Sequence, residues 1–188
     1  MRRVWILAAT VSLVLATTSL AFADNWGAIY DEPTSVSFQD DSLVSYQFDT
    51  NLSSHMRSAS DWTLINSYAT TDLNILKVGD GHDTDWNNHY AIGSMPISGL
   101  IGYHDCVYWV SFSRTRCRHG HVRYKNSSLS TTTYERALAC HETAHSVGLR
   151  HKGSSANSQS IVRCVWNPVP SNDPYVGSHN VAHINGLY

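Results

Sequence analysis

The sequence predicts a single domain that mixes β-strands with α-helices. Leu43 to Phe48 alternates apolar and polar side chains, as a half-buried strand does. The closing stretch, Ser178 to Tyr188, instead repeats apolar residues at helical spacing. Residues 24–188 have the length of one ordinary domain, so we expect one hydrophobic core and no second domain.

Residues 1–23 predict a secretory signal peptide. Arg2 and Arg3 precede an apolar run, and the small-x-small sequence from Ala21 to Ala23 favours cleavage after Ala23. The alternative is a retained membrane anchor, which needs about 20 uninterrupted apolar residues. Serines and threonines interrupt this run. We therefore expect a secreted, extracellular protein that keeps no membrane attachment after cleavage.

Composition excludes some classes of partner. The net charge of -2 and the charged fraction of 15% provide no basic surface for nucleic acid, so we expect no nucleic-acid role. We expect a monomer. The chain has 4 cysteines, an even number that predicts two disulfides in an exported protein. Spacing alone leaves three pairings open.

The first elements can be placed in order. Residues 24–42 are polar and acidic, which favours an irregular leader or a short pro-segment. After the strand at Leu43–Phe48, either Ser53 or Ser54 can cap a helix. The apolar stripe of that helix consists of Met56, Ala59, Trp62, Leu64 and Ile65.

Asp72 to Val78 favours a second strand, and the turn that follows, Gly79 to Asp85, is dense in carboxylates. That turn could hold calcium through oxygen ligands, although it lacks EF-hand spacing, and a solvated turn is the alternative. The aspartates concerned are Asp80, Asp83 and Asp85. Gly93 to Tyr103 favours a bent edge strand because glycine and proline interrupt it.

Two cysteines bracket the next predicted element. Val107 to Thr115 alternates apolar and polar residues between Cys106 and Cys117, so a disulfide closing a hairpin is the simplest pairing. His121 to Tyr124 is then predicted as the last strand before a long helix. Five scattered histidines show no ligand spacing, and we expect them at the surface or in the core. They are His82, His89, His104, His119 and His121.

The long helix carries the chemistry. Thr132 and Glu135 have the spacing of a capping box that would start it, and Tyr134, Leu138 and Val147 supply apolar contacts. His141 and His145 are four residues apart, which stacks two imidazoles on one face, as a zinc site needs. Glu142 is rotated about 100° from His141, so its carboxylate would flank the ion and touch a metal-bound water.

His151 is the expected third ligand. An unbroken helix would carry it to another face, but Gly148 can take the left-handed conformation that ends a helix and turns the chain back. Three neutral histidines and one water form the open tetrahedral site of a catalytic zinc. The competing interpretation is a surface helix that happens to be rich in histidine.

His141 to His151 matches H-E-x-x-H-x-x-G-x-x-H at every fixed position, and the chain therefore resembles the metzincin zinc endopeptidases, with a small matrixin-like catalytic domain. The resemblance implies an α+β fold: a twisted mixed sheet packed on helices, an active-site helix under the cleft and a small C-terminal subdomain. It also implies that Leu100 to Tyr103 borders the cleft and pairs with an extended peptide. The substrate pocket would be shaped by the loop from Lys152 to Ser160.

Later residues both extend this resemblance and depart from it. Val162 stands at the position where the clan places a methionine beneath the zinc. Met56 and Met95 both lie upstream of the helix, so neither can supply that methionine. Valine is shorter and branched, so packing under the imidazoles must differ. Cys140 could ligate zinc as a thiolate, but a disulfide to Cys164 is favoured. Some metzincins use a tyrosine to stabilise the oxyanion, and here the possible residues are Tyr175 and Tyr188.

The leading hypothesis is a secreted zinc metalloendopeptidase that hydrolyses peptide bonds in protein or peptide substrates, with Glu142 as general base. The leader contains no cysteine for thiolate latency, although an aspartate could serve. A second hypothesis, motivated by Val162, is a zinc-binding protein or degenerate metzincin that binds partners without cleaving them. A third is a zinc hydrolase whose third ligand is a distant carboxylate rather than His151.

Overall fold

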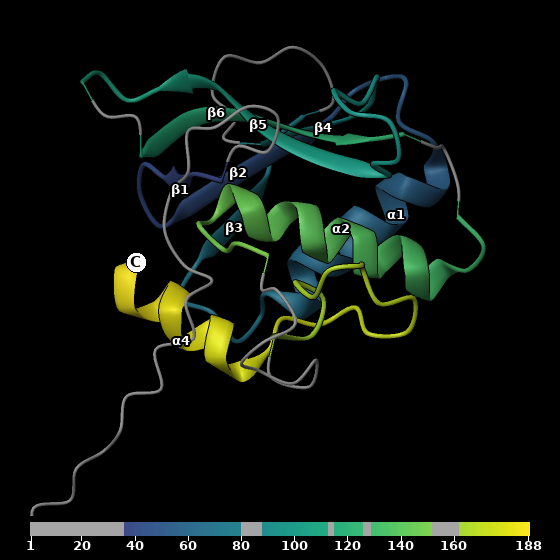
Figure 1. Cartoon of the computed structure of the whole chain (residues 1–188). Coiled ribbons are helices and arrows are strands. Elements are labelled where there is room, and N and C mark those ends of the chain that lie inside the picture. The colour runs from purple at the N-terminus through teal and green to yellow at the C-terminus, as the bar shows by residue number, and fades with distance from the viewer. Residues whose placement is uncertain (1–35, 80–87, 113–114, 126–128, 152–161) are drawn as a thin grey trace, which may run out of the picture.

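The computed structural model describes residues 36–79, 88–112, 115–125, 129–151 and 162–188. A twisted sheet forms one layer, with strand order β1-β6-β4-β2-β3 and with β5 paired to β6 (Figure 1). Neighbouring strands run parallel except β5 and β6, which are antiparallel, so the sheet is mixed as predicted. The strands are β1 Phe38–Gln39, β2 Leu43–Phe48, β3 Asn74–Lys77, β4 Asn88–Ile92, β5 Gly102–Trp109 and β6 Arg116–Tyr124.

The helices pack on one side of the sheet. Figure 1 shows α1 and α2 next to the strands and α4 farther away, below α2 in that view. The helical segments are α1 Ser54–Trp62, the π-helical turn η1 Thr63–Ser67, α2 Thr132–Ser146 and α4 Ser178–Leu187. This arrangement confirms the predicted fold class, a mixed sheet packed on helices. No helix within the described ranges is both long and apolar enough to cross a membrane.

Two apolar clusters hold α2 from opposite sides. One lies between α2, the sheet and α1 and includes Tyr90, Val122 and Leu138. The other joins α2 to the C-terminal segment and includes Ala144 and Ile184. Burying an aliphatic or aromatic side chain stabilises the fold by about 1.5–3 kcal/mol. Because both faces are covered, α2 has little freedom to rotate or shift, which matters for the side chains that it carries.

The first part of the described chain contains one correction. The strands predicted at Leu43–Phe48 and within Asp72–Val78 are confirmed. The leader, however, is not irregular to its end, because Phe38–Gln39 forms β1 beside β6. Ser37 N also donates to the carbonyl oxygen of His145 at 3.0 Å, which attaches this segment to the end of α2. The signal peptide, the start of the leader, the turn at Asp80–Asp85 and the loop at 152–160 lie outside the described residues.

Strand β4 has no apolar–polar alternation and was not predicted. Asn88 is fully buried, and its side-chain nitrogen donates to Ser146 Oγ on α2 at 3.0 Å. His89 is also buried, with Nε2 3.5 Å from Asp49 Oδ2. Polar residues therefore occupy buried positions because polar partners on other elements satisfy them, a pattern that hydrophobicity does not reveal.

The edge strand and the hairpin differ from prediction in their bounds. Most of Gly93–Tyr103 is not a strand, and pairing begins only at Gly102, the start of β5. The predicted last strand, His121–Tyr124, is the end of the longer β6. Cys106 and Cys117 form the predicted disulfide across the β5–β6 hairpin.

Helix starts follow the expected chemistry with small shifts. Ser53 caps α1, since its hydroxyl accepts from Met56 N at 3.3 Å. The cap of α2 is Thr131 and not Thr132, and the Glu135 carboxylate accepts instead from Leu129 N at 3.1 Å. Ile65 is 63% exposed, contrary to prediction. The reason is that α1 widens into the η1 turn, whose period differs from that of an α-helix.

Candidate metal centre

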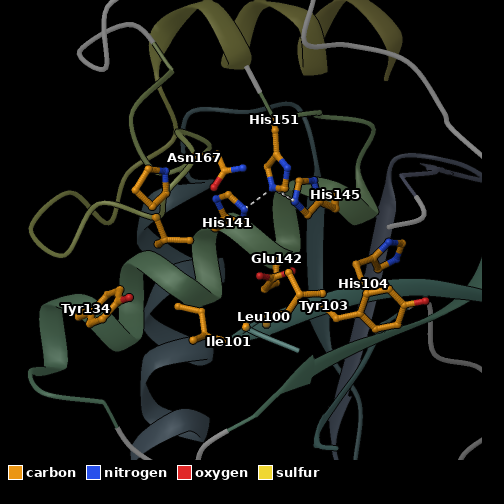
Figure 2. Close-up of a pocket in the computed structure, with 14 residues that line it drawn as sticks. Leu100, Ile101, Tyr103, His104, Tyr134, His141, Glu142, His145, His151 and Asn167 are labelled. Carbon is orange, nitrogen blue, oxygen red and sulfur yellow. Dashed lines mark hydrogen bonds between the residues drawn. The ribbon is translucent and has the colours of Figure 1, made fainter. Parts of the chain in front are cut away.

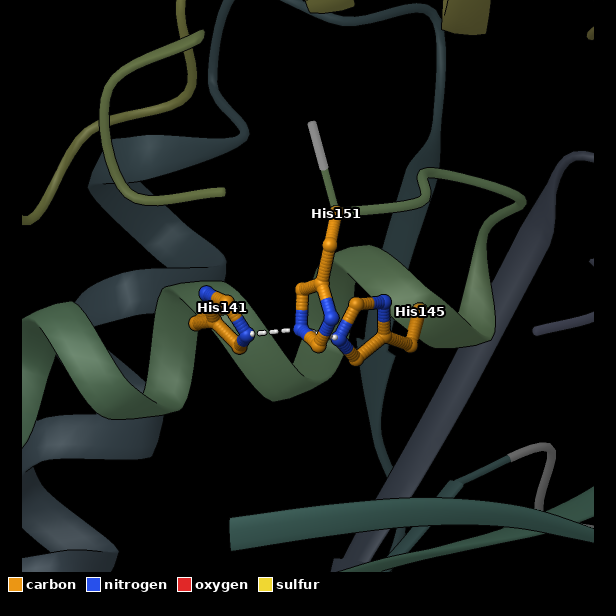
Figure 3. A group of neighbouring side chains, drawn as sticks. All are labelled: His141, His145 and His151. Atoms are coloured by element: carbon orange, nitrogen blue, oxygen red, sulfur yellow. Dashed lines mark hydrogen bonds between the residues drawn. The ribbon is translucent and has the colours of Figure 1, made fainter. Parts of the chain in front are cut away.

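α2 presents His141 and His145 on one face, four residues apart. Both side chains are buried, and their ring centroids are 4.8 Å apart. The two clusters that enclose α2 fix the direction of this face, so the rings are placed before any ligand arrives. Figures 2 and 3 show both imidazoles pointing to the same point above the helix.

The chain reverses directly after α2, as the sequence predicted. Gly148 has a φ of 95°, in the left-handed region that favours glycine. Leu149 N donates to the carbonyl oxygen of Ala144 at 2.9 Å, which closes the helix end, and the Leu149 side chain is fully buried. This anchored turn brings His151 back over the helix toward the other two rings (Figure 3).

Three ring nitrogens converge. His151 Nε2 lies 2.7 Å from His141 Nε2 and 3.0 Å from His145 Nε2. The possible ligand atoms of the three residues all lie within 4.8 Å of one another, and the group could bind a metal ion. No aspartate or glutamate belongs to this group within the described ranges.

Backbone carbonyls on the outer side of the site select the tautomers. His141 Nδ1 donates to the carbonyl oxygen of Cys164 at 2.8 Å, and His145 Nδ1 donates to that of Leu149 at 2.7 Å. A carbonyl oxygen only accepts, so each Nδ1 carries the hydrogen and each neutral ring keeps a lone pair on Nε2. The inward-facing nitrogens thus have the protonation state that a divalent metal requires.

Burial also keeps these rings neutral. Desolvation, followed by the effect of His151, lowers the pKa of His141 to about 3. The same causes hold the pKa of His145 well below its ordinary value, and burial lowers that of His151. Zinc binds neutral imidazole, so the site does not have to lose protons near neutral pH.

Glu142 lies beside the three histidines, and burial raises its pKa to about 8. A cation bound by the imidazoles would favour the carboxylate and oppose this shift. The start of β5 passes very close: a Cβ built on Gly102 would lie 2.3 Å from Glu142 Oε1 and 2.6 Å from its Cδ. A larger residue at position 102 would therefore have to displace the Glu142 side chain from this position.

The three histidines and Glu142 line a partly open cavity of about 300 Å³. Figure 2 shows the residues that line it. The predicted rim, Leu100 to Tyr103, does line this cavity. The full lining is Gly99, Leu100, Ile101, Gly102, Tyr103, His104, Tyr134, His141, Glu142, His145, His151, Asn167, Pro168 and Val169.

Several lining residues were not predicted. Tyr134 lies seven residues before His141, two turns along the same helix face, a signal that the spacing did contain. The segment from Asn167 to Val169 gives no such signal, because only the tertiary fold brings it to the cavity. The scattered histidines were expected at the surface or in the core, and His89 and His104 are buried. His104 also lines the cavity.

The remaining predictions concern the segment after the third histidine. Cys140 and Cys164 form a disulfide, as predicted, so Cys140 is not available as a thiolate ligand. Val162 is fully buried, and its carbonyl oxygen accepts from Asn180 Nδ2 at 3.1 Å. The possible oxyanion tyrosines do not line the cavity. Tyr175 packs on the Trp62 ring, and Tyr188 Oη accepts from the backbone N–H of residue 39 at 2.7 Å.

The chain matches no protein-family model and no curated protein. Among solved structures it is similar to high choriolytic enzyme 1, a hatching-enzyme zinc protease from the medaka fish Oryzias latipes. The identity is 11%, the TM-score is 0.46, and the match covers 86% of this chain and 98% of that one. A similarity at this level supports no functional conclusion.

Proposed function

We propose that this protein is a secreted zinc-dependent endopeptidase that hydrolyses peptide bonds in protein substrates. One observation carries the proposal: the Nε2 atoms of His141, His145 and His151 converge beside a buried carboxylate in a partly open cavity. The signal-like N-terminus and the two disulfides support an extracellular location.

The donor set fits zinc. His141, His145 and His151 would hold the ion through Nε2, since the Nδ1 atoms of the first two rings already donate to backbone carbonyls. Three imidazoles would match the protein donor set of catalytic zinc sites, in which water or substrate is the fourth ligand. When bound, zinc acts as a Lewis acid that polarises the scissile carbonyl and lowers the pKa of water from about 15.7 to about 7.

Glu142 is the general base. Its carboxylate accepts a proton from the water whose oxygen attacks the carbonyl carbon of the peptide bond. It then passes the proton to the nitrogen of the departing amine as the C–N bond breaks. The position of Glu142 beside the three imidazoles, in the lining of the same cavity, supports this role.

The strand edge beside Glu142 would bind the substrate backbone. Leu100 to Tyr103 lines the cavity and leads into β5, which pairs on one side with β6 in the described part of the sheet. An extended peptide can add to such an edge through main-chain hydrogen bonds, largely independent of side chains. Ile101, Tyr134 and Val169 provide apolar and aromatic surface for one substrate side chain.

A second candidate function is a zinc-binding protein that does not cleave its partners. The observation in its favour is Val162, fully buried at the position where the resembled clan has methionine. A zinc hydrolase with a distant carboxylate as third ligand has less support. His151 already lies against the rings of His141 and His145, and among the described residues no aspartate or glutamate belongs to this group.

The test compares the parent protein with Glu142→Gln, which keeps the size of the side chain but cannot accept the proton. We expect both to bind one zinc per chain in metal analysis. We expect the variant to digest casein about 10²–10⁴-fold more slowly, and chelator to abolish digestion by the parent. A matched control is His55→Gln, an exposed position on α1, which should leave both readouts unchanged.

The outcomes separate the two candidates. Zinc bound by a parent protein that cleaves neither casein nor gelatin would favour the non-cleaving binder. Equal digestion by the parent and by Glu142→Gln would refute the assigned base.

A further inference from the structure

A second pair of histidines lies on α4, outside the site described above. His179 and His183 are four residues apart, and their Nε2 atoms are 3.0 Å from each other. Their ring centroids are 4.5 Å apart, with the ring planes at 88°. Neither residue lines the cavity beside Glu142. The contact therefore belongs to a different part of the molecule.

The packing of α4 determines where these rings lie. Ile184 is fully buried, and Val181 packs against the same apolar cluster. Asn180 is also buried and donates to the carbonyl oxygen of Val162 at 3.1 Å. These contacts fix the rotation of the helix and leave His179 and His183 half-buried, so both rings are held by the fold while solvent can still reach them.

The two Nε2 atoms are near enough either for a hydrogen bond or for a bidentate chelate. The distance between the two Nε2 atoms equals the 3.0 Å between His145 and His151 in the triad. Two neutral rings in this position can share one hydrogen, or both can direct a lone pair at one cation. Because the helix already holds the rings together, binding a cation costs little additional ordering.

We propose that His179 and His183 form a second metal site, for a borderline divalent transition metal such as Zn²⁺, Ni²⁺ or Cu²⁺. Imidazole nitrogen suits these ions and not Ca²⁺ or Mg²⁺, and Cu²⁺ should bind most tightly. The two imidazoles are the only histidine, cysteine or carboxylate ligands that the proposal uses. With two protein ligands in place of three, the site binds more weakly than the triad.

The site would act as a clamp on α4. A metal that bridges positions 179 and 183 stabilises the turn containing Asn180, whose side chain holds the Val162 carbonyl. Val162 begins the segment that leads to Cys164, the hydrogen-bond partner of His141. Metal at α4 would therefore stabilise the structure that supports the first histidine of the triad. This inference does not depend on the peptidase proposal.

The experiment measures metal stoichiometry in the full chain. Protein carrying one zinc is dialysed against rising free Zn²⁺, and bound zinc is counted. We expect a second equivalent on the parent and on His55→Gln, and its loss or at least tenfold weakening in His179→Gln and His183→Gln. Glutamine can still form a hydrogen bond to the remaining ring, so the comparison separates metal binding from ring pairing.

Thermal unfolding of each variant tests whether the substitution has damaged the fold. In chelator, the α4 variants should melt within a few degrees of the parent. In excess zinc, only the parent and His55→Gln should gain the additional increase in Tm that a second bound ligand gives. The proposal is overturned if the parent binds only one zinc at every concentration reached, or if the α4 variants keep the second equivalent and its Tm increase.

Discussion

The histidine pairs on α2 and α4 share one spacing and differ in their surroundings. His141 and His145 are buried between two apolar clusters, whereas His179 and His183 are half-buried on a helix near the end of the chain. The α2 pair has a third ring, two carbonyl partners and a neighbouring carboxylate. The same i,i+4 spacing therefore brings two imidazoles together in both helices, but only on α2 do burial, a third ring and a neighbouring carboxylate accompany them.

The turn at Gly148 is the largest single difference between the pairs, because it supplies the third ring. Replacing His151 with alanine reduces the α2 site to a pair like that on α4. We expect zinc affinity to fall by more than 100-fold, since even loss of an outer-shell partner costs 10–100-fold, and casein digestion to be abolished. Competition against a chelator of known affinity measures the first effect.

His55→Gln is the matched control for that variant, and it should change neither the affinity of the triad nor digestion. If His151→Ala kept the affinity of the parent for zinc, the triad would not be the metal site. The third ligand would then have to come from elsewhere in the chain.

The base at α2 depends on one glycine, a feature with no counterpart on α4. A methyl group at Gly102 would lie 2.3 Å from Glu142 Oε1 and must displace the carboxylate. We expect Gly102→Ala to keep one zinc and lose about 100-fold in kcat, because a misplacement of about 1 Å at a reacting group costs that much. Steady-state kinetics on a peptide substrate, with metal analysis, checks this expectation.

Gly186→Ala is the corresponding control, because a Cβ there meets nothing within 4 Å. It should leave kcat unchanged. An active Gly102→Ala enzyme would show that Glu142 has room to move without loss of function.

Acid should destabilise protein stripped of metal through the buried histidines of the triad. The pKa of His141 is about 3 in the fold, and those of His145 and His151 are also lowered, against 6.5 in the unfolded chain. Only the unfolded chain then takes up these protons as the pH falls. The contribution of the three histidines to the free energy of unfolding is therefore complete above pH 6.5 and is lost as the pH falls toward 3. Each proton bound only by the unfolded chain lowers the free energy of unfolding by about 1.4 kcal/mol per pH unit.

Glu142 acts in the opposite direction. Its pKa is raised from 4.5 to about 8, so its contribution is complete below pH 4.5 and is lost as the pH rises through 8. Three histidines outweigh one carboxyl group, and we expect the free energy of unfolding to fall by about 1–2 kcal/mol from pH 6.5 to 5.5. Urea titrations in chelator measure it. The change in unfolding free energy with pH should be smaller in His141→Asn than in the parent, and equal changes would contradict the assigned burial effect.

The convergence of the three histidines could be predicted from sequence because its signal is local. His141, Glu142, His145, Gly148 and His151 lie within one helix and one turn, where spacing alone determines direction. Both disulfides were predicted because four cysteines in one exported domain leave few choices. The mixed sheet on helices likewise followed from periodicity and from the clan that the motif resembles.

Non-local features could not be predicted in this way. β4 buries Asn88 against Ser146 of α2, and a polar residue gives no sign of burial until its partner is known. β1 exists only because β6 lies beside it, and Asn167 reaches the cavity through the fold of the C-terminal segment. Ile65 was misplaced because the π-helical turn changes the period of the helix.

The Cys140–Cys164 bridge joins the residue before the first imidazole to the residue whose carbonyl orients that same imidazole. Oxidation of Cys140 and the orientation of the neighbouring His141 ring are therefore linked through the same segment of chain. A chain held in a reducing compartment would lack this tie and would hold its first ring less firmly. Under the proposed peptidase function, the metal centre would then be completed only under oxidising conditions.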